Sequence, residues 1–282
     1  LIAYYRAQKL FEQGILNHEN ANRGVLIKTF VTTDLQKAIA KKFGLRLVET
    51  LTGFKYIGAK LLKYERALPA DVAADYRSLP EKETRRLRLK HSSYYIFGGE
   101  ESYGYSGADF VRDKDANGAA VMFCEVAAYA KSRGLTIDGF LDQIYAELGF
   151  YLEKSGALTF DGAEGAAKIQ RLLASYTTDP PNEMLGSAVT SVKDFARETY
   201  RDVEGDEIPK EKMLIFELAN HTRIAVRASG TEPKIKYYLF AQRRPEHGPF
   251  APNELAEIKA ELAQRLEALW SWLQTDAQRR AE

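Results

Sequence analysis

The sequence is poor in the features of secreted, membrane-spanning and nucleic-acid-binding proteins. Its 282 residues include 1 cysteine, Cys124, so no internal disulfide can form and a reducing compartment, the cytoplasm, is expected. No apolar run approaches the roughly 20 residues of a membrane helix, and no signal-peptide pattern is present. The formal net charge of +1 disfavours nucleic acid or a membrane surface as a partner, because both require a basic field.

What the chain does contain fits a globular protein with about two cores. The sequence is 45% hydrophobic and 28% charged, which is typical of folded domains and sufficient for buried interiors. The chain begins at Leu1 and not at Met, so we expect an upstream part to be missing. No internal repeat or low-complexity segment is found.

The first half alternates between strand and helix patterns. Leu35, Ile39 and Phe43 form one apolar helical stripe, which Thr32 or Thr33 is predicted to cap and Gly44 to end. Strands are predicted before and after this helix, and further helices follow. The predicted strands cover 24–31, 45–50 and 94–97, and the other predicted helices cover 54–64, 117–133 and 137–148. This alternation predicts an α/β domain with a mostly parallel sheet.

A polar segment, residues 65–93, interrupts this alternation. Acidic and basic residues are interspersed along it, as in the run from Glu81 to Arg88. We interpret the segment as a solvated insertion. The alternative is that its basic residues contact a partner.

The second half groups its strands together. Strands are predicted at 158–160, 189–199, 213–218, 223–226 and 235–241, with a helix at 163–176 before the break at Asp179–Asn182. Asn253 is predicted to cap a last helix with a leucine-rich core stripe, namely Leu255, Ile258, Leu262, Leu266, Leu269 and Leu273. This grouping predicts an α+β domain, and we expect the two domains to span 1–150 and 151–282.

A loop between two of the predicted strands has the composition of a phosphate site. Arg227 offers a planar fork of donors that fits two phosphate oxygens, and Ser229 and Thr231 add hydroxyl groups. Gly230 lets backbone N–H groups turn towards an anion. The lysines at 234 and 236 add positive charge nearby. The alternative is an ordinary polar hairpin turn, because Ser-Gly-Thr turns are common.

A second loop follows the strand predicted at 94–97 and is rich in glycine and carboxylates. Glu100 or Glu101 could accept hydrogen bonds from neighbouring sugar hydroxyls, and Ser102 could donate or accept. Neighbouring residues of an extended loop point in opposite directions, so only one of the two glutamates should face a given ligand. A solvated turn is the alternative.

Further along the chain, the charged residues 112–115 precede a predicted helix. Lys114 could supply a cation for a phosphate, or act as an acid or base. Asp115 equally suits the N-terminal cap of that helix.

Together these segments resemble the α-D-phosphohexomutase superfamily, and most closely the glucose-type bacterial phosphoglucomutases. Four motifs occur in the order seen in that family, and they are Thr52-Gly53-Phe54-Lys55, Gly99-Glu100-Glu101-Ser102, Arg112-Asp113-Lys114-Asp115 and Arg227-Ala228-Ser229-Gly230-Thr231. Family members have four domains, and this chain resembles the third and the fourth. The resemblance implies a three-layer α/β domain followed by an α+β domain with a TATA-binding-protein-like fold.

The resemblance also implies roles for individual residues. Sugar hydroxyls would be held by Glu100 and Ser102, and Glu101 matches the glucose-type pattern better than the mannose-type pattern. The substrate would further be faced by Thr52, Gly53, Lys55 and the possible assisting residue Lys114. The phosphate that is not transferred would be bound by Arg227, Ser229, Gly230 and Thr231.

The reaction that the resemblance implies needs groups that this sequence lacks. In the family, a phosphoserine of the first domain donates the phosphoryl group beside a Mg²⁺ ion held by the second domain. Glucose 1-phosphate and glucose 6-phosphate are interconverted through glucose 1,6-bisphosphate. Neither a Ser-His motif nor an Asp-x-Asp-x-Asp-Arg motif is present here. We therefore expect no catalytic or metal-binding residue in this chain, missing N-terminal domains I and II as partners, and no activity of the chain alone.

Two other functions remain open at this stage. One is a different specificity within the family, for mannose, glucosamine or pentose phosphates. The other is a non-catalytic module that binds sugar phosphates.

Overall fold

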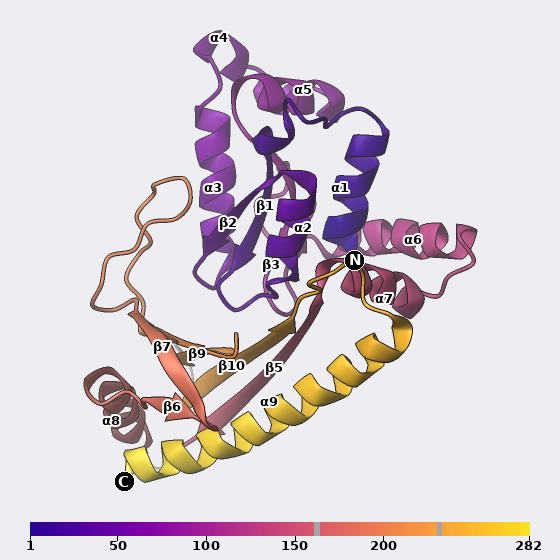
Figure 1. Ribbon diagram of the computed structural model, residues 1–282. Coiled ribbons are helices and arrows are strands. Elements are labelled where there is room, and N and C mark those ends of the chain that lie inside the picture. Colours follow the sequence, from indigo (N-terminus) through magenta and orange to yellow (C-terminus); the bar gives the residue numbers. More distant parts are fainter. Residues whose placement is uncertain (161–163, 230–232) are drawn as a thin grey trace. The chain divides into compact units, whose positions relative to one another are not determined.

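Backbone packing divides the chain into two compact units. A computed structural model describes residues 1–160, 164–229 and 233–282 (Figure 1). Unit 1 comprises Leu1–Ile144 and Arg201–Asp206, and unit 2 comprises Tyr145–Tyr200 and Glu207–Glu282. The division into family domains at residue 150 remains a prediction.

The sheet of unit 1 has the order β2-β1-β3-β4. Its three longer strands are β1 (Gly24–Thr29), β2 (Arg46–Thr50) and β3 (Tyr94–Gly99), and β1 pairs in parallel with both neighbours. The short strand β4 (Tyr105–Ser106) runs antiparallel to β3. The mostly parallel sheet predicted from the sequence is therefore confirmed.

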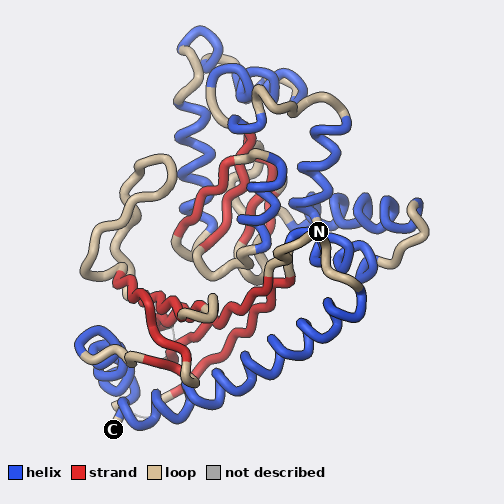
Figure 2. The backbone as a smooth tube through the Cα atoms, in the orientation of Figure 1, coloured by secondary structure: helices blue, strands red, loops and turns tan. Residues whose placement is uncertain are grey.

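Helices cover both faces of this sheet, as expected for a three-layer fold (Figures 1 and 2). Because strand residues alternate between faces, Val25 and Ile27 pack against α3 (Phe54–Arg66), whereas Leu26 points to the other side. On that other side, α1 (Ile2–Glu12) contacts β3 and α2 (Leu35–Phe43) contacts β1 and β2. Two further helices, α6 (Ala116–Ser132) and α7 (Ile137–Leu148), follow β4 in the chain.

The polar segment 65–93 is ordered and partly buried, so its interpretation as a solvated insertion is only partly right. It forms α4 (Ala70–Ala73), a short 3₁₀ helix (Tyr76–Ser78) and α5 (Glu81–His91). Leu68, Tyr76 and Leu87 make a small core of their own. The side chain of Arg88 lies beneath them, with its Nε donating to the hydroxyl of Tyr76 and its Nη2 donating to a carboxylate of the loop before α6. Because acidic and basic residues are interspersed along this segment, the burial of Arg88 was not predicted from the sequence.

Unit 2 is an antiparallel sheet of order β5-β10-β9-β8-β7-β6. Its strands are β5 (Phe150–Thr159), β6 (Glu183–Met184), β7 (Ser187–Asp194), β8 (Met213–Leu218), β9 (Arg223–Ala228) and β10 (Lys234–Arg243). The α+β grouping is confirmed. The strand predicted at 158–160 is in fact ten residues long, because polar residues alternate along its solvent face and hide it from an apolar-run criterion.

Two helices bury the core face of the unit 2 sheet. They are α8 (Gly165–Thr178) and the 30-residue α9 (Pro252–Ala281), which lies along β5 and β10 (Figure 2). The predicted leucine stripe of α9 is buried along its whole length. No helix in the described part of the chain is both long and apolar enough to cross a membrane.

Helix ends were predicted less accurately than helix positions. Asp34 occupies the N-cap position of α2 but makes no side-chain capping hydrogen bond, whereas the hydroxyl of the predicted Thr33 accepts one from the N–H of Leu35. The helix α9 begins at Pro252, so Asn253 lies inside it and does not cap it. Gly44, with a φ of 64°, ends α2 as predicted, and Asp115 caps α6 by accepting a hydrogen bond from the backbone N–H of Gly118.

The stripe of α9 allows a direct stability test. Leu262 is fully buried, so Leu262→Ala should lower the free energy of unfolding of unit 2 by about 2–5 kcal/mol through lost contacts and a residual cavity. Urea denaturation followed by tryptophan fluorescence reports on this unit, because both tryptophans, Trp270 and Trp272, lie in α9. Gln264→Ala, at an exposed position of the same helix, is the control. Equal midpoints for the two variants would contradict the packing.

Candidate functional site

Two of the predicted substrate loops lie at one edge of the unit 1 sheet. Thr52 and Gly53 follow the end of β2, and Glu100 follows the end of β3. Because these strands are parallel through β1, their carboxyl ends share an edge, where open α/β sheets bind ligands. The fold thus brings together residues that are 47 positions apart in the sequence.

A hydrogen bond joins the two loops. The backbone N–H of Gly53 donates to a carboxylate oxygen (Oε1) of Glu100 at 2.6 Å. The loop of Glu100 is closed by its own N–H, which donates to the carbonyl of Gly104 at 2.9 Å. A Cβ on Gly104 would lie 2.9 Å from the second carboxylate oxygen of Glu100, so glycine leaves the room that this carboxylate occupies. Glu100 is therefore held at both its backbone and its side chain.

Lys114 lies close to these loops. Its ammonium is 5.3 Å from the centre of the Phe54 ring, which directly follows Gly53. A hydrogen bond with Asp113, together with the negative charge of Glu100, raises the pKa of Lys114. The side chain is thus a stable cation at neutral pH, which suits it to attract an anion and not to act as a base.

The loop that carries Lys114 is braced against α3. Arg112 pairs with Glu65 near the end of that helix, and its Nε donates to the carbonyl of Asp109 at 3.0 Å. A Cβ at Gly58 would lie 2.9 Å from the carbonyl oxygen of Arg112, so this glycine allows the loop to approach the helix closely. These contacts fix the approach of Lys114 to the site.

A buried network of charged side chains supports the same edge of the unit 1 sheet. The ammonium of Lys28, which is fully buried, lies 3.0 Å from Asp34 and 2.9 Å from Glu49, and it donates to the carbonyl of Thr32. The hydroxyl of Thr32 in turn donates to the carbonyl of Gly99, the residue before Glu100. Nothing in the sequence marked Lys28 as special, because it stands in an apolar run and its partners are 6 and 21 positions away.

The other predicted residues of this edge make fewer contacts. Ser102 and Glu101 are exposed at the tip of the β3–β4 turn, and Tyr103 beside them adopts a φ of 56°. Lys55 is exposed on the first turn of α3, with its ammonium 4.8 Å from the ring of Tyr56. Of the two glutamates, Glu100 is thus the one that the fold holds in place.

The predicted phosphate loop lies in unit 2, between β9 and β10. Arg227 is directly opposite Lys236 across this strand pair, so two cations share one face of the sheet. The Nε of Arg227 is 3.7 Å from a carboxylate oxygen of Glu211, and the N–H of Ser229 donates to the carbonyl of Lys234. Gly230 and Thr231 lie outside the described residues.

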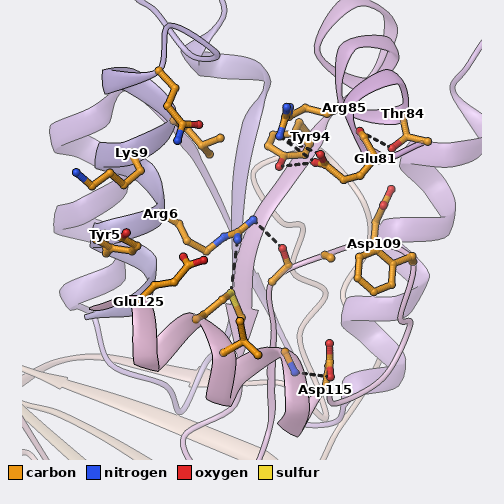
Figure 3. A pocket seen from close by; sticks show the side chains of 18 of the residues that line it. Tyr5, Arg6, Lys9, Glu81, Thr84, Arg85, Tyr94, Asp109, Asp115 and Glu125 are labelled. Atoms are coloured by element: carbon orange, nitrogen blue, oxygen red, sulfur yellow. Dashed lines mark hydrogen bonds and ion pairs between the residues drawn. The ribbon is translucent and has the colours of Figure 1, made fainter. Parts of the chain in front are cut away.

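One cavity of unit 1 lies away from these loops. It measures about 890 Å³ and lies among α1, α5, α6 and residues 107–110 (Figure 3). Its charged side chains pair with one another, as in the contacts of Arg85 with Glu81 at 3.0 Å and of Arg88 with Asp109 at 2.8 Å. None of the predicted substrate residues lines it. We therefore do not assign the substrate to this cavity.

One group of carboxylates has the spacing of a metal site. Oxygen atoms of Asp202, Glu204 and Asp206 lie within 4.8 Å of one another. The ammonium of Lys60 contacts all three carboxylates and supplies the cation that they require. In the described part of the chain, this group does not offer Mg²⁺ a set of available ligands.

The sequence comparisons settle the relationship. A sequence profile described as phosphoglucomutase/phosphomannomutase, alpha/beta/alpha domain III, matches residues 2–76 and 81–148. The chain belongs to the phosphoglucomutase/phosphomannomutase family. The matched region is the part of unit 1 that carries the loops of Gly53, Glu100 and Lys114. The family resemblance inferred from the four motifs is confirmed.

Named relatives and a solved structure agree. The phosphoglucomutase of Staphylococcus epidermidis is 31% identical over 247 residues, which are 84% of this chain and 40% of the relative. That of Staphylococcus haemolyticus is 30% identical over 231 residues, or 80% of this chain and 37% of the relative. The open form of pp63/parafusin from Paramecium matches 97% of this chain and 41% of its own, with a TM-score of 0.53 and 18% identity, and supports the fold. The chain spans about 40% of the length of these relatives.

The buried network predicts how unit 1 responds to acid. Burial opposes the charge of Glu49, but Lys28 and Lys37 outweigh it and hold the pKa of Glu49 below its ordinary value of 4.5. A lowered pKa contributes stability above the unfolded value, and this contribution is lost as pH falls through the folded value. Between about pH 5 and pH 3, the protection factors for hydrogen exchange in β1 and β2 should therefore fall more in the wild type than in Glu49→Gln. The same acid response in both proteins would contradict this role.

Proposed function

We propose that this chain is the sugar-phosphate-recognition part of an enzyme that interconverts glucose 1-phosphate and glucose 6-phosphate. A phosphoserine elsewhere in the full-length protein would donate a phosphoryl group to the free hydroxyl of the sugar phosphate. The resulting glucose 1,6-bisphosphate would reorient and return its other phosphoryl group to the serine. Mg²⁺ would act beside that serine, and the enzyme would work in the cytoplasm.

The observation that carries this proposal is the hydrogen bond from Gly53 to Glu100. It leaves the second carboxylate oxygen of Glu100 available to accept from a sugar hydroxyl, at a position set by two loops. Thr52 and Ser102 can add hydroxyl contacts, and Lys114 with Lys55 would attract the negatively charged substrate. These roles agree with the order of motifs in the family.

The charges of the unit 2 loop support a phosphate site. Arg227 and Lys236 lie directly opposite each other on the sheet, so an anion bound near them would be attracted by both. The guanidinium of Arg227 can donate two parallel hydrogen bonds to the phosphate that is not transferred. Ser229, Gly230 and Thr231 would complete this site.

A titration tests both loops. The chain should bind glucose 6-phosphate with a Kd on the order of a millimolar, because it supplies only part of the site of the intact enzyme. Arg227→Ala should weaken binding about tenfold or more, since charge-assisted hydrogen bonds are lost. Glu100→Ala should reduce the preference for glucose 6-phosphate over mannose 6-phosphate, as measured by calorimetry or NMR.

Controls separate these effects from general changes in charge. Arg243→Ala removes an exposed arginine at the far end of β10 and should leave binding unchanged. Inorganic sulfate should compete weakly and in the same way with the wild type and Glu100→Ala. Stronger binding of mannose or pentose phosphates would assign a different specificity, and binding indifferent to both substitutions would contradict the assigned residues.

The chain alone should show no sustained mutase turnover. With glucose 1-phosphate, Mg²⁺ and catalytic glucose 1,6-bisphosphate, a coupled assay should form glucose 6-phosphate no faster than the blank. Arg227→Ala purified in the same way is the control, because a contaminating enzyme would give both preparations equal activity. Turnover present in the wild type and absent in the variant would refute inactivity.

A further inference from the structure

The segment Arg201–Asp206 has an unusual position in the chain. It lies in the long connection between β7 and β8 of unit 2, yet its packing places it in unit 1. Its neighbours Tyr200 and Glu207 both belong to unit 2. The backbone therefore passes from one unit to the other at 144/145 and again on both sides of this segment, which we call the strap.

The strap is a preformed turn. A carboxylate oxygen of Asp202 accepts from the N–H groups of Glu204 and Asp206, at 2.8 and 3.1 Å. The N–H of Asp202 donates to the carbonyl of Asp206, and Gly205 takes a φ of 80° that few other residues tolerate. These hydrogen bonds close the turn, and oxygen atoms of its three carboxylates lie within 4.8 Å of one another.

A basic and aromatic surface on unit 1 receives these carboxylates. Glu204 accepts from the hydroxyl of Tyr64 at 2.7 Å and from the ammonium of Lys60 at 3.1 Å. The other contacts involve Arg46, 3.2 Å from Glu204, and Lys63, which pairs with Asp206. Three carboxylates of the strap thus meet three cations of unit 1.

Burial makes this contact stronger than a surface ion pair. The side chains of Lys60, Asp202 and Glu204 are 10%, 6% and 7% exposed. Burial opposes the charge of Lys60, but its carboxylate partners outweigh burial and raise the pKa of Lys60. Hydrogen bonds from Lys60 and Lys63 lower the pKa of Asp206. Lys60 and Asp206 are therefore both held in their charged forms, and undocking the strap would leave Lys60 without its partners.

We propose that the strap is an ionic latch that holds the β7–β8 connection on α3. The helix that receives the latch begins at Phe54, directly after Gly53. Movement of the strap would therefore act on the helix that carries a predicted substrate loop. This inference does not depend on the proposed reaction or on any ligand.

Glu204→Gln tests the latch in the complete chain without ligand. The substitution keeps the size of the side chain but removes the charge at the centre of the cluster. Cleavage by trypsin after Arg201, followed by mass spectrometry, should become at least about tenfold faster, because the docked segment is protected and the undocked segment is not. The matched control is Glu217→Gln on β8, which removes the same charge from an exposed ion pair with Lys193 of β7. It should leave the rate of cleavage after Arg201 unchanged.

A double-mutant cycle distinguishes a latch from general destabilisation. Tyr64→Phe removes the hydroxyl that Glu204 accepts from, so its effect on the cleavage rate should be less than additive with that of Glu204→Gln. Trypsin cleavage after Lys28 in β1 should stay unchanged in every variant. Fully additive effects, or faster cleavage throughout unit 1, would overturn the latch.

Discussion

The unit 1 site depends on a buried ammonium group at the end of β1. Lys28 compensates two carboxylates from different elements and holds the turn at Thr32, whose hydroxyl fixes the carbonyl before Glu100. A lysine without partners would not remain charged at such a position. The carboxyl edge of the sheet is therefore held by electrostatics as well as by backbone hydrogen bonds. The positions of the Gly53 and Glu100 loops, which follow the strands at this edge, depend on it.

Much of the fold could be predicted from the sequence because local and global preferences agree. The stripe on α9 and the run that forms β8 have the period of the element that they build, and both were located closely. The strand β5 was underestimated because its alternating pattern includes Glu153, Lys154 and Ser155. The burial of Arg88 could not be predicted, since its partner Asp109 is 21 residues away and no local pattern connects them.

The residues of the candidate site also divide into those that could be predicted from the sequence and those that could not. Short motifs identified Gly53, Glu100 and Lys114, and the parallel sheet explains why they meet. The supporting residues escaped notice because their roles arise from pairings between distant segments, as with Thr32 and Gly99. Sequence reasoning finds side chains whose chemistry is unusual for their local setting, and it misses ordinary side chains whose partners are supplied by the fold.

The position of α3 limits how its length can change. The helix starts beside the Gly53–Glu100 hydrogen bond, and Lys60 and Lys63 on its second and third turns contact the strap. One inserted residue would rotate everything after it by about 100°, turning these lysines away from their carboxylates while leaving the substrate loop in place. Natural variation in the length of this helix should therefore be confined to its end beyond Glu65, which pairs with Arg112.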